Sequence, residues 1–217
     1  MAPIESRGAQ RVIARLKAML WPPPINSAAE LRAFIAGESA VIAQKTAMGY
    51  CTAKTGSFSY ALFQEKRFID ALAICRWEAF AAVLSDMLVI LETFLRPSAD
   101  GQAVPIGQAL ASIYADILRS YAAPPHRPEG WAEAIAAFEE RLAAAQAGPP
   151  VEPAAVATAS GRRLYEVLPL HTNYRVDDEQ VIVASVTFQM VGVWDMMHRR
   201  INGPAVVSDL VRAAATD

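Results

Sequence analysis

Four charged residues stand within the apolar faces of two predicted helices, and they are the first candidates for chemistry. A helix is predicted for residues 28–53, because its apolar residues recur at steps of three and four. Glu38 and Lys45 interrupt the apolar face that these residues form. Glu65 and Arg76 do the same in a helix predicted for residues 57–96. A buried carboxylate near other charges has a shifted pKa, which suits general acid–base work or the binding of a charged ligand.

These charges can also serve structure alone. In an antiparallel hairpin turning at residues 55–56, Lys45 would face Glu65, and Glu38 would lie within reach of Arg76. A slip of one heptad would bury these charges against apolar side chains at a cost of several kcal/mol. We therefore predict two ion pairs that fix the register of the hairpin. A ligand cavity lined by the same four residues is the alternative.

His171 is the one further candidate for a ligand-binding site, and no catalytic residue can be assigned. It lies in a loop between two predicted helices and precedes Thr172-Asn173-Tyr174-Arg175. Loops carry binding residues more often than helices do. A histidine that only hydrogen-bonds to loop backbone is the alternative, and it is the one we expect.

Complete catalytic and metal-binding motifs are missing from the sequence. There is no Gly-x-Ser-x-Gly, P-loop, Gly-x-Gly-x-x-Gly or Cys-x-x-Cys pattern, and no Glu-x-x-His. Asp195-x-x-His198 is a single pair, and Glu78, Ser85 and Glu92 recur at a spacing of seven without histidine partners. We interpret these three as a solvated face or a close helix contact. We expect no metal and no cofactor, and a protein that is not an enzyme.

Helices dominate the predicted secondary structure. Residues 57–96 contain neither glycine nor proline and are too many for a strand. Further helices are predicted at about 8–20, 106–121, 129–146, 154–167 and 177–201. The β-branched run at 181–188 leaves a strand open, but capping signals at both ends favour a helix. The fold class is all-α, an irregular helical bundle of six or seven helices built on the long antiparallel hairpin.

The chain reads as a single helical domain over residues 1–217. Residues 1–21 contain an N-terminal amphipathic helix, and residues 147–153 form a Pro/Ala linker before a C-terminal two-helix segment. Arg7, Arg11 and Arg15 share the basic face of the first helix. That face is either solvated or makes weak contact with an anionic membrane surface through residues 7–20.

Composition points to association with other proteins. Charged residues are 19% and hydrophobic residues 53% of the chain, so we expect apolar surface that a homo-oligomer or a protein partner would cover. The net charge of -2 argues against nucleic acid. Cys51 and Cys75 are predicted to be free, and Asp86 and Glu92 argue against a membrane span at 79–95. We expect a cytoplasmic protein.

Residues 55–72, TGSFSYALFQEKRFIDAL, resemble the segment of TetR-type regulators in which the recognition helix gives way to the next helix. The shared points are Tyr60, Phe63, Lys66 and the apolar run that follows. The resemblance implies a DNA-binding helical regulator. The glycine turn that should precede the recognition helix is missing, and Gly49-Tyr50-Cys51 stands nearest to its place.

The leading hypothesis is a non-enzymatic helical protein that acts by self-association or as an adaptor. Three alternatives stay open: a small-molecule-binding or enzymatic domain that uses the charged inter-helix cavity, a peripheral membrane protein, and a TetR-like regulator.

Overall fold

A computed structural model describes residues 23–214 of the chain, and helices make up nearly all of it. Within this range there is no strand, only an isolated bridge between Ile25 and Ile201. The predicted all-α class is confirmed. The predicted helix at 8–20 lies outside the described residues. The helices are α2 (Ala28–Thr55), α3 (Ser59–Leu62), α4 (Lys66–Leu95), α5 (Ala103–Arg119), α6 (Ala132–Ala147), α7 (Pro153–Val167), α8 (Glu179–Arg200) and α9 (Gly203–Ala214).

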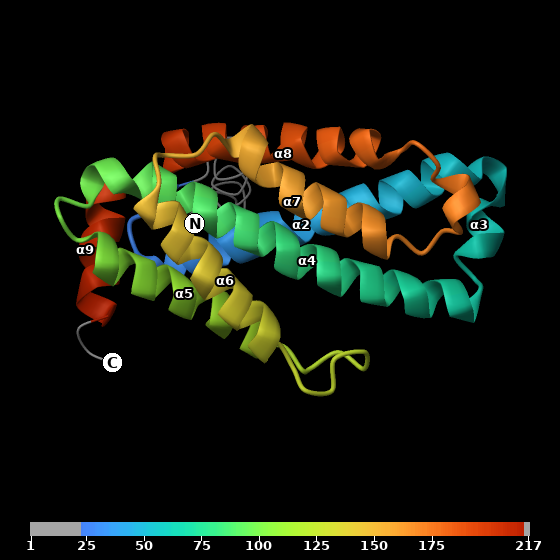
Figure 1. Ribbon diagram of the computed structural model, residues 1–217, viewed down its shortest axis with the longest axis horizontal. Helices are drawn as coiled ribbons and strands as arrows, with labels where there is room; N and C mark the ends of the chain where they lie inside the picture. The colour runs from blue at the N-terminus through green and yellow to red at the C-terminus, as the bar shows by residue number, and fades with distance from the viewer. Residues whose placement is uncertain (1–22, 215–217) are drawn as a thin grey trace, which may run out of the picture.

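Two long antiparallel helices, α2 and α4, form the hairpin that the sequence predicts, but the turn between them lies elsewhere (Figure 1). Gly56 ends α2 at φ +52°, and a 3₁₀ turn and the four-residue α3 follow. Glu65 is extended, and α4 begins only at Lys66. The predicted single helix over 57–96 is therefore wrong in its continuity: residues 59–62 form the separate helix α3, and the long helix begins nine residues later than predicted. These nine residues are mainly Ser, Phe, Tyr and Gln, several of them weaker helix formers than the Ala and Leu that follow.

The displaced turn changes the register, and neither predicted ion pair forms. Arg76 donates a 2.6 Å hydrogen bond to Gln44 Oε1 instead of meeting Glu38. Among residues 23–214, no ion pair joins Lys45 to Glu65.

Both cysteines are free and buried, as predicted. Burial raises the pKa of Cys51 to about 11. Burial, and to a smaller extent Cys51, raise the pKa of Cys75 to about 12.

The C-terminal half follows the sequence expectations closely. Helices α5, α6, α7 and α8 match the four predicted segments, and residues 181–188 are helical. Helix α9 was not predicted, because Gly203-Pro204 was interpreted only as a stop signal. Proline also suits the first turn of a helix, where its missing N–H costs nothing. Asn202 Oδ1 accepts from the Ala205 N–H at 3.4 Å, which caps the new helix.

Helix α4 runs through the centre of the bundle and supplies more of the core than any other described helix (Figure 1). Leu84, Met87, Leu88 and Leu91 have no exposed surface. A helix that is apolar nearly all round is expected to be central. Helix α8, by contrast, lies at the side of the bundle, where many of its residues are exposed.

Helices α7 and α8 pack most closely at Gly161 of α7. A Cβ added at Gly161 would lie 2.8 Å from Val183 Cα of α8, a distance that side chains do not tolerate against backbone. Gly37 and Gly49 of α2 differ, because nothing lies within 4 Å of an added Cβ at either.

This difference gives a testable prediction about packing. Gly161→Ala should lower the free energy of unfolding by about 1–3 kcal/mol, because α7 and α8 must move apart. Gly37→Ala is the matched control and should raise it by up to about 1 kcal/mol through helix propensity. Urea unfolding measures both. A Gly161→Ala variant as stable as Gly37→Ala would show that the two helices do not touch there.

Candidate functional site

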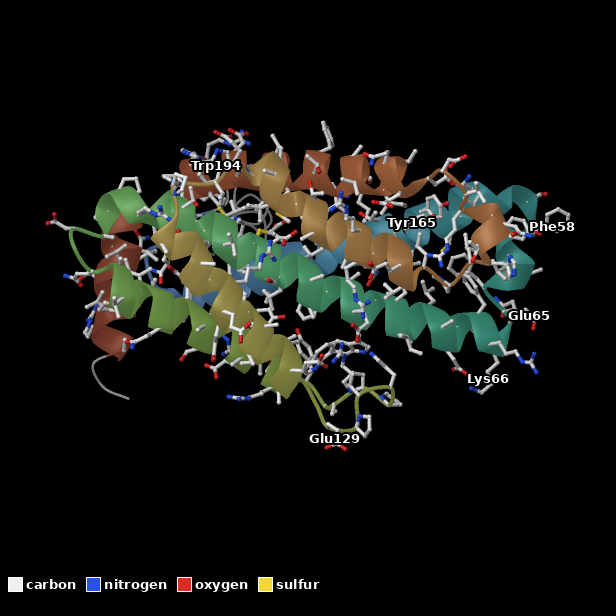
Figure 2. All side chains as sticks on the ribbon, in the orientation of Figure 1. Phe58, Glu65, Lys66, Glu129, Tyr165 and Trp194 are labelled. Carbon is white, nitrogen blue, oxygen red and sulfur yellow. The ribbon has the colours of Figure 1, made fainter. Side chains whose placement is uncertain are left out.

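The five residues singled out from the sequence do not gather into one site. Glu65 is exposed at the beginning of α4, at the end of the molecule that also carries Phe58 (Figure 2). Arg76 is exposed and bound to Gln44, and Lys45 is exposed on α2. These charged residues therefore do not line a common cavity between α2 and α4, which was the alternative interpretation of the sequence.

Glu38 and His171 have local roles. Burial raises the pKa of Glu38, and the nearby charge of Arg200 opposes that rise. Arg200 itself stacks over the Phe34 ring, 5.1 Å from its centroid. His171 is exposed, and its Nδ1 accepts a 3.2 Å hydrogen bond from the Asn173 N–H at the start of a 3₁₀ turn. His171 thus bonds to loop backbone, as expected.

The polar face of α4 is buried. Of the two interpretations of Glu78, Ser85 and Glu92, the solvated face is wrong and the close helix contact is confirmed, and Asp86 is buried as well. Burying an ionised carboxylate costs several kcal/mol unless cations and hydrogen bonds compensate. Each of these carboxylates has an arginine partner, as set out below.

Glu78 has the most partners of these carboxylates. Arg127, in the loop before α6, makes a two-pronged contact through Nε and Nη2, and Arg163 of α7 donates to Oε2 at 2.7 Å. His126 Nε2 lies 2.9 Å from Oε1. Burial alone would raise the pKa of Glu78, but the bonds from Arg127, Arg163 and His126 outweigh it and lower the pKa to about 2. Glu78 is therefore a fixed negative charge that holds the loop and α7 against α4.

Asp86 is less well satisfied. Its Oδ2 accepts from the Ser160 N–H at 3.0 Å. Arg141 Nη1 lies 2.5 Å from Oδ1 but donates its hydrogen bond to Ser85 Oγ at 2.8 Å, so Oδ1 is left without a hydrogen bond. Burial raises the pKa of Asp86 against the opposing charge of Arg141.

Glu92 pairs with Arg96, which directly follows α4, and the same guanidinium donates to the carbonyls of Ala145 and Gly148. This contact ties the end of α6 to α4.

An open cleft of about 450 Å³ lies above this polar face. Its floor is α4, and its sides are α6 and α7, which diverge from their connection at 148–152 (Figure 1). The lining combines arginines and aromatic rings: Arg127, Arg141, Arg163, Tyr114, Trp131 and Phe138.

Among residues 23–214, no group of three His, Cys, Asp or Glu side chains could hold a metal ion. Asp195 pairs with Arg199, and His198 Nδ1 lies 3.0 Å from the Trp194 carbonyl, so the Asp195-x-x-His198 pair is engaged within its own helix.

A second feature is an apolar surface where α2 and α8 run side by side. Phe188 is 81% exposed, and Val41, Val181 and Val191 are also exposed. A groove of about 560 Å³ between the helices is lined by Lys45, Gly49, Val181 and Phe188 among others, and Gln189 of α8 donates to Thr46 of α2 at 2.8 Å. We call this the α2–α8 surface and define it by Val41, Lys45, Gly49, Val181, Phe188 and Val191.

Within the described part of the chain, α8 is the one helix long and apolar enough to span a membrane by length and composition, a weak criterion that core helices of soluble proteins also meet. Only 28% of its most apolar stretch is buried, so most of that stretch is left uncovered in the structure.

Comparison of the chain with protein-family models, curated proteins and solved structures found no match in any of the three. The cleft over α4 and the α2–α8 surface are therefore the features of the molecule that bear on its function.

The Glu78 cluster yields a prediction about stability and pH. Glu78→Gln should lower the free energy of unfolding by about 2–4 kcal/mol at neutral pH, because Arg127 and Arg163 lose their buried partner. The lowered pKa means that the carboxylate stabilises the folded state above pH 4.5, and that this contribution is lost as the pH falls towards 2.

Denaturant unfolding across this pH range measures both effects, with Glu140→Gln on the exposed side of α6 as the control. Wild type should lose more stability than Glu78→Gln between pH 4.5 and 2. Equal losses would show that Glu78 is not held as a buried anion.

Proposed function

We propose that the protein acts as a self-associating module and forms a two-fold homodimer through the α2–α8 surface. The observation that carries this proposal is Phe188, a large aromatic side chain that is 81% exposed in the middle of a helix. Large exposed apolar groups that are contiguous with others mark interaction sites on soluble proteins. The low charge of the chain supports the same function.

The shape of the surface favours a second copy over an unrelated partner. A two-fold interface uses the same patch on both subunits, so the patch must complement itself. The α2–α8 surface carries both a projecting ring, Phe188, and a groove whose lining includes Gly49. Reciprocal insertion of Phe188 into the partner's groove would bury both rings.

The exposed glycines fit this arrangement. Gly49 of α2 and Gly192 of α8 each have nothing within 4 Å of an added Cβ, so neither is needed for packing inside the chain. A glycine inside a helix costs about 1 kcal/mol relative to alanine. Close approach of a partner helix would account for that cost at both positions.

The test is the oligomeric state by sedimentation equilibrium at micromolar concentration. Wild type should be a dimer, and Phe188→Glu should be monomeric because the insertion would bury a carboxylate, with dissociation at least tenfold easier. Phe58→Glu is the matched control, since Phe58 is 76% exposed in the turn after α2 and does not line the groove, and it should remain a dimer.

Two outcomes would contradict the proposal. One is a wild-type protein that stays monomeric at these concentrations. The other is Phe188-dependent binding to lipid vesicles by a monomer, which would make α8 a membrane contact. Vesicle binding that is lost when residues 1–21 are deleted would instead assign the membrane contact to the N-terminal segment.

A further inference from the structure

The cleft between α6 and α7 has a lining that its own ion pairs do not satisfy. Arg141 of α6 uses Nη1 for Ser85 and Asp86, whereas its Nε and Nη2 make no hydrogen bond to any residue in 23–214. Arg163 of α7 uses Nη1 and Nη2 for Glu166 and Glu78 and leaves Nε uncommitted. Both guanidinium groups line the cleft and remain partly exposed. Two arginines of the lining therefore carry N–H donors that no described residue accepts.

The charges of the lining do not balance. Arg127, Arg141 and Arg163 supply three positive charges, and the buried Glu78 and Asp86 supply two negative ones, which leaves one in excess. Two further carboxylates are on the solvent side of these arginines: Glu133 is 93% exposed and 3.8 Å from Arg127, and Glu166 is 61% exposed and 3.1 Å from Arg163. Water screens both of these charges. A single negative charge entering the cleft would complete the balance.

Aromatic rings that are themselves almost fully buried pack beneath one side of the cleft. Tyr114 and Phe138 stack with ring centroids 4.3 Å apart, and Trp131 lies under the Arg127 guanidinium at 4.8 Å. Asp86 Oδ1 is 2.5 Å from Arg141 Nη1, whereas the buried Trp131 Nε1 has no hydrogen-bond partner among the described residues. Buried polar groups are nearly always satisfied, so the Trp131 N–H points to a component that is not part of the chain.

We propose that this cleft binds a small organic anion. Its carboxylate or phosphate group would seat between Arg141 and Arg163, because guanidinium forks match both groups. Its apolar body would lie against an apolar wall formed by the exposed side chains of Ala137 and Ala159. The volume of about 450 Å³ is within the range of small-molecule sites. The proposal is independent of the dimer, since the cleft and the α2–α8 surface share no residue.

Isothermal titration calorimetry with phenyl phosphate, benzoate and inorganic phosphate tests the proposal at low ionic strength. We expect saturable one-to-one binding of at least one aromatic probe, at least tenfold tighter than inorganic phosphate because of the apolar wall. The phosphate and carboxylate probes distinguish the two headgroups. If no probe saturates, or inorganic phosphate binds as tightly as both aromatic probes, the proposal is wrong.

Paired variants locate the binding. Arg141→Ala should weaken it at least tenfold, whereas Arg162→Ala should not, because Arg162 is an exposed neighbour of Arg163 paired with Glu179. Arg141→Ala also removes a partner of Asp86 and could weaken binding through a loss of structure. Two further variants therefore leave every ion pair of the cleft intact. Ala137→Trp fills the cleft from an exposed position and should abolish binding. Ala136→Trp, equally exposed but outside the lining, should not. Binding that survives Ala137→Trp would overturn the assignment.

Discussion

The burial of carboxylates on the central helix is the constraint on which the rest of the structure depends. Helix α4 is the core of the bundle, and it carries Glu78, Asp86 and Glu92 with almost no exposed surface. Each ionised group would cost several kcal/mol if left alone. The loop before α6, α6 itself and α7 must therefore place Arg127, Arg141 and Arg163 over α4, and that requirement fixes where they lie. The open cleft follows, because these pairs form where α6 and α7 have already diverged.

Much of the fold was predictable because local signals and tertiary packing agree. Proline breaks, capping residues and apolar spacing located α5, α6, α7 and α8 to within a few residues. The prediction for the residues after Gly56 was wrong because the absence of glycine and proline does not by itself make a helix. Ser57, Phe58 and Tyr60 have modest helix propensity, and packing was free to choose short turns there. Because the turn lies elsewhere, the register of α2 against α4 differs from the predicted one, and neither predicted ion pair forms.

The sequence indicated one part of the candidate site, the polar face of α4, but not the residues that cover it. The spacing of seven between Glu78, Ser85 and Glu92 did mark one face of α4, but nothing local showed whether water or another helix covers it. The covering arginines lie far away along the chain, 49 residues from Glu78 for Arg127 and 85 for Arg163. Such pairings are set by tertiary structure, so the spacing of residues in a single sequence does not indicate them. The exposure of α8 was hidden for the same reason, since an apolar helix can be central or lie at an uncovered surface.

The most direct test of this account is the pKa of the Glu78 side chain, followed by ¹³C NMR of the glutamate carboxyl groups and assigned with the Glu78→Gln variant. The arginine contacts predict a pKa of about 2 in the folded protein. A value at or above the ordinary 4.5 would mean that burial outweighs the arginines, and it would contradict the arrangement of α6 and α7 around α4.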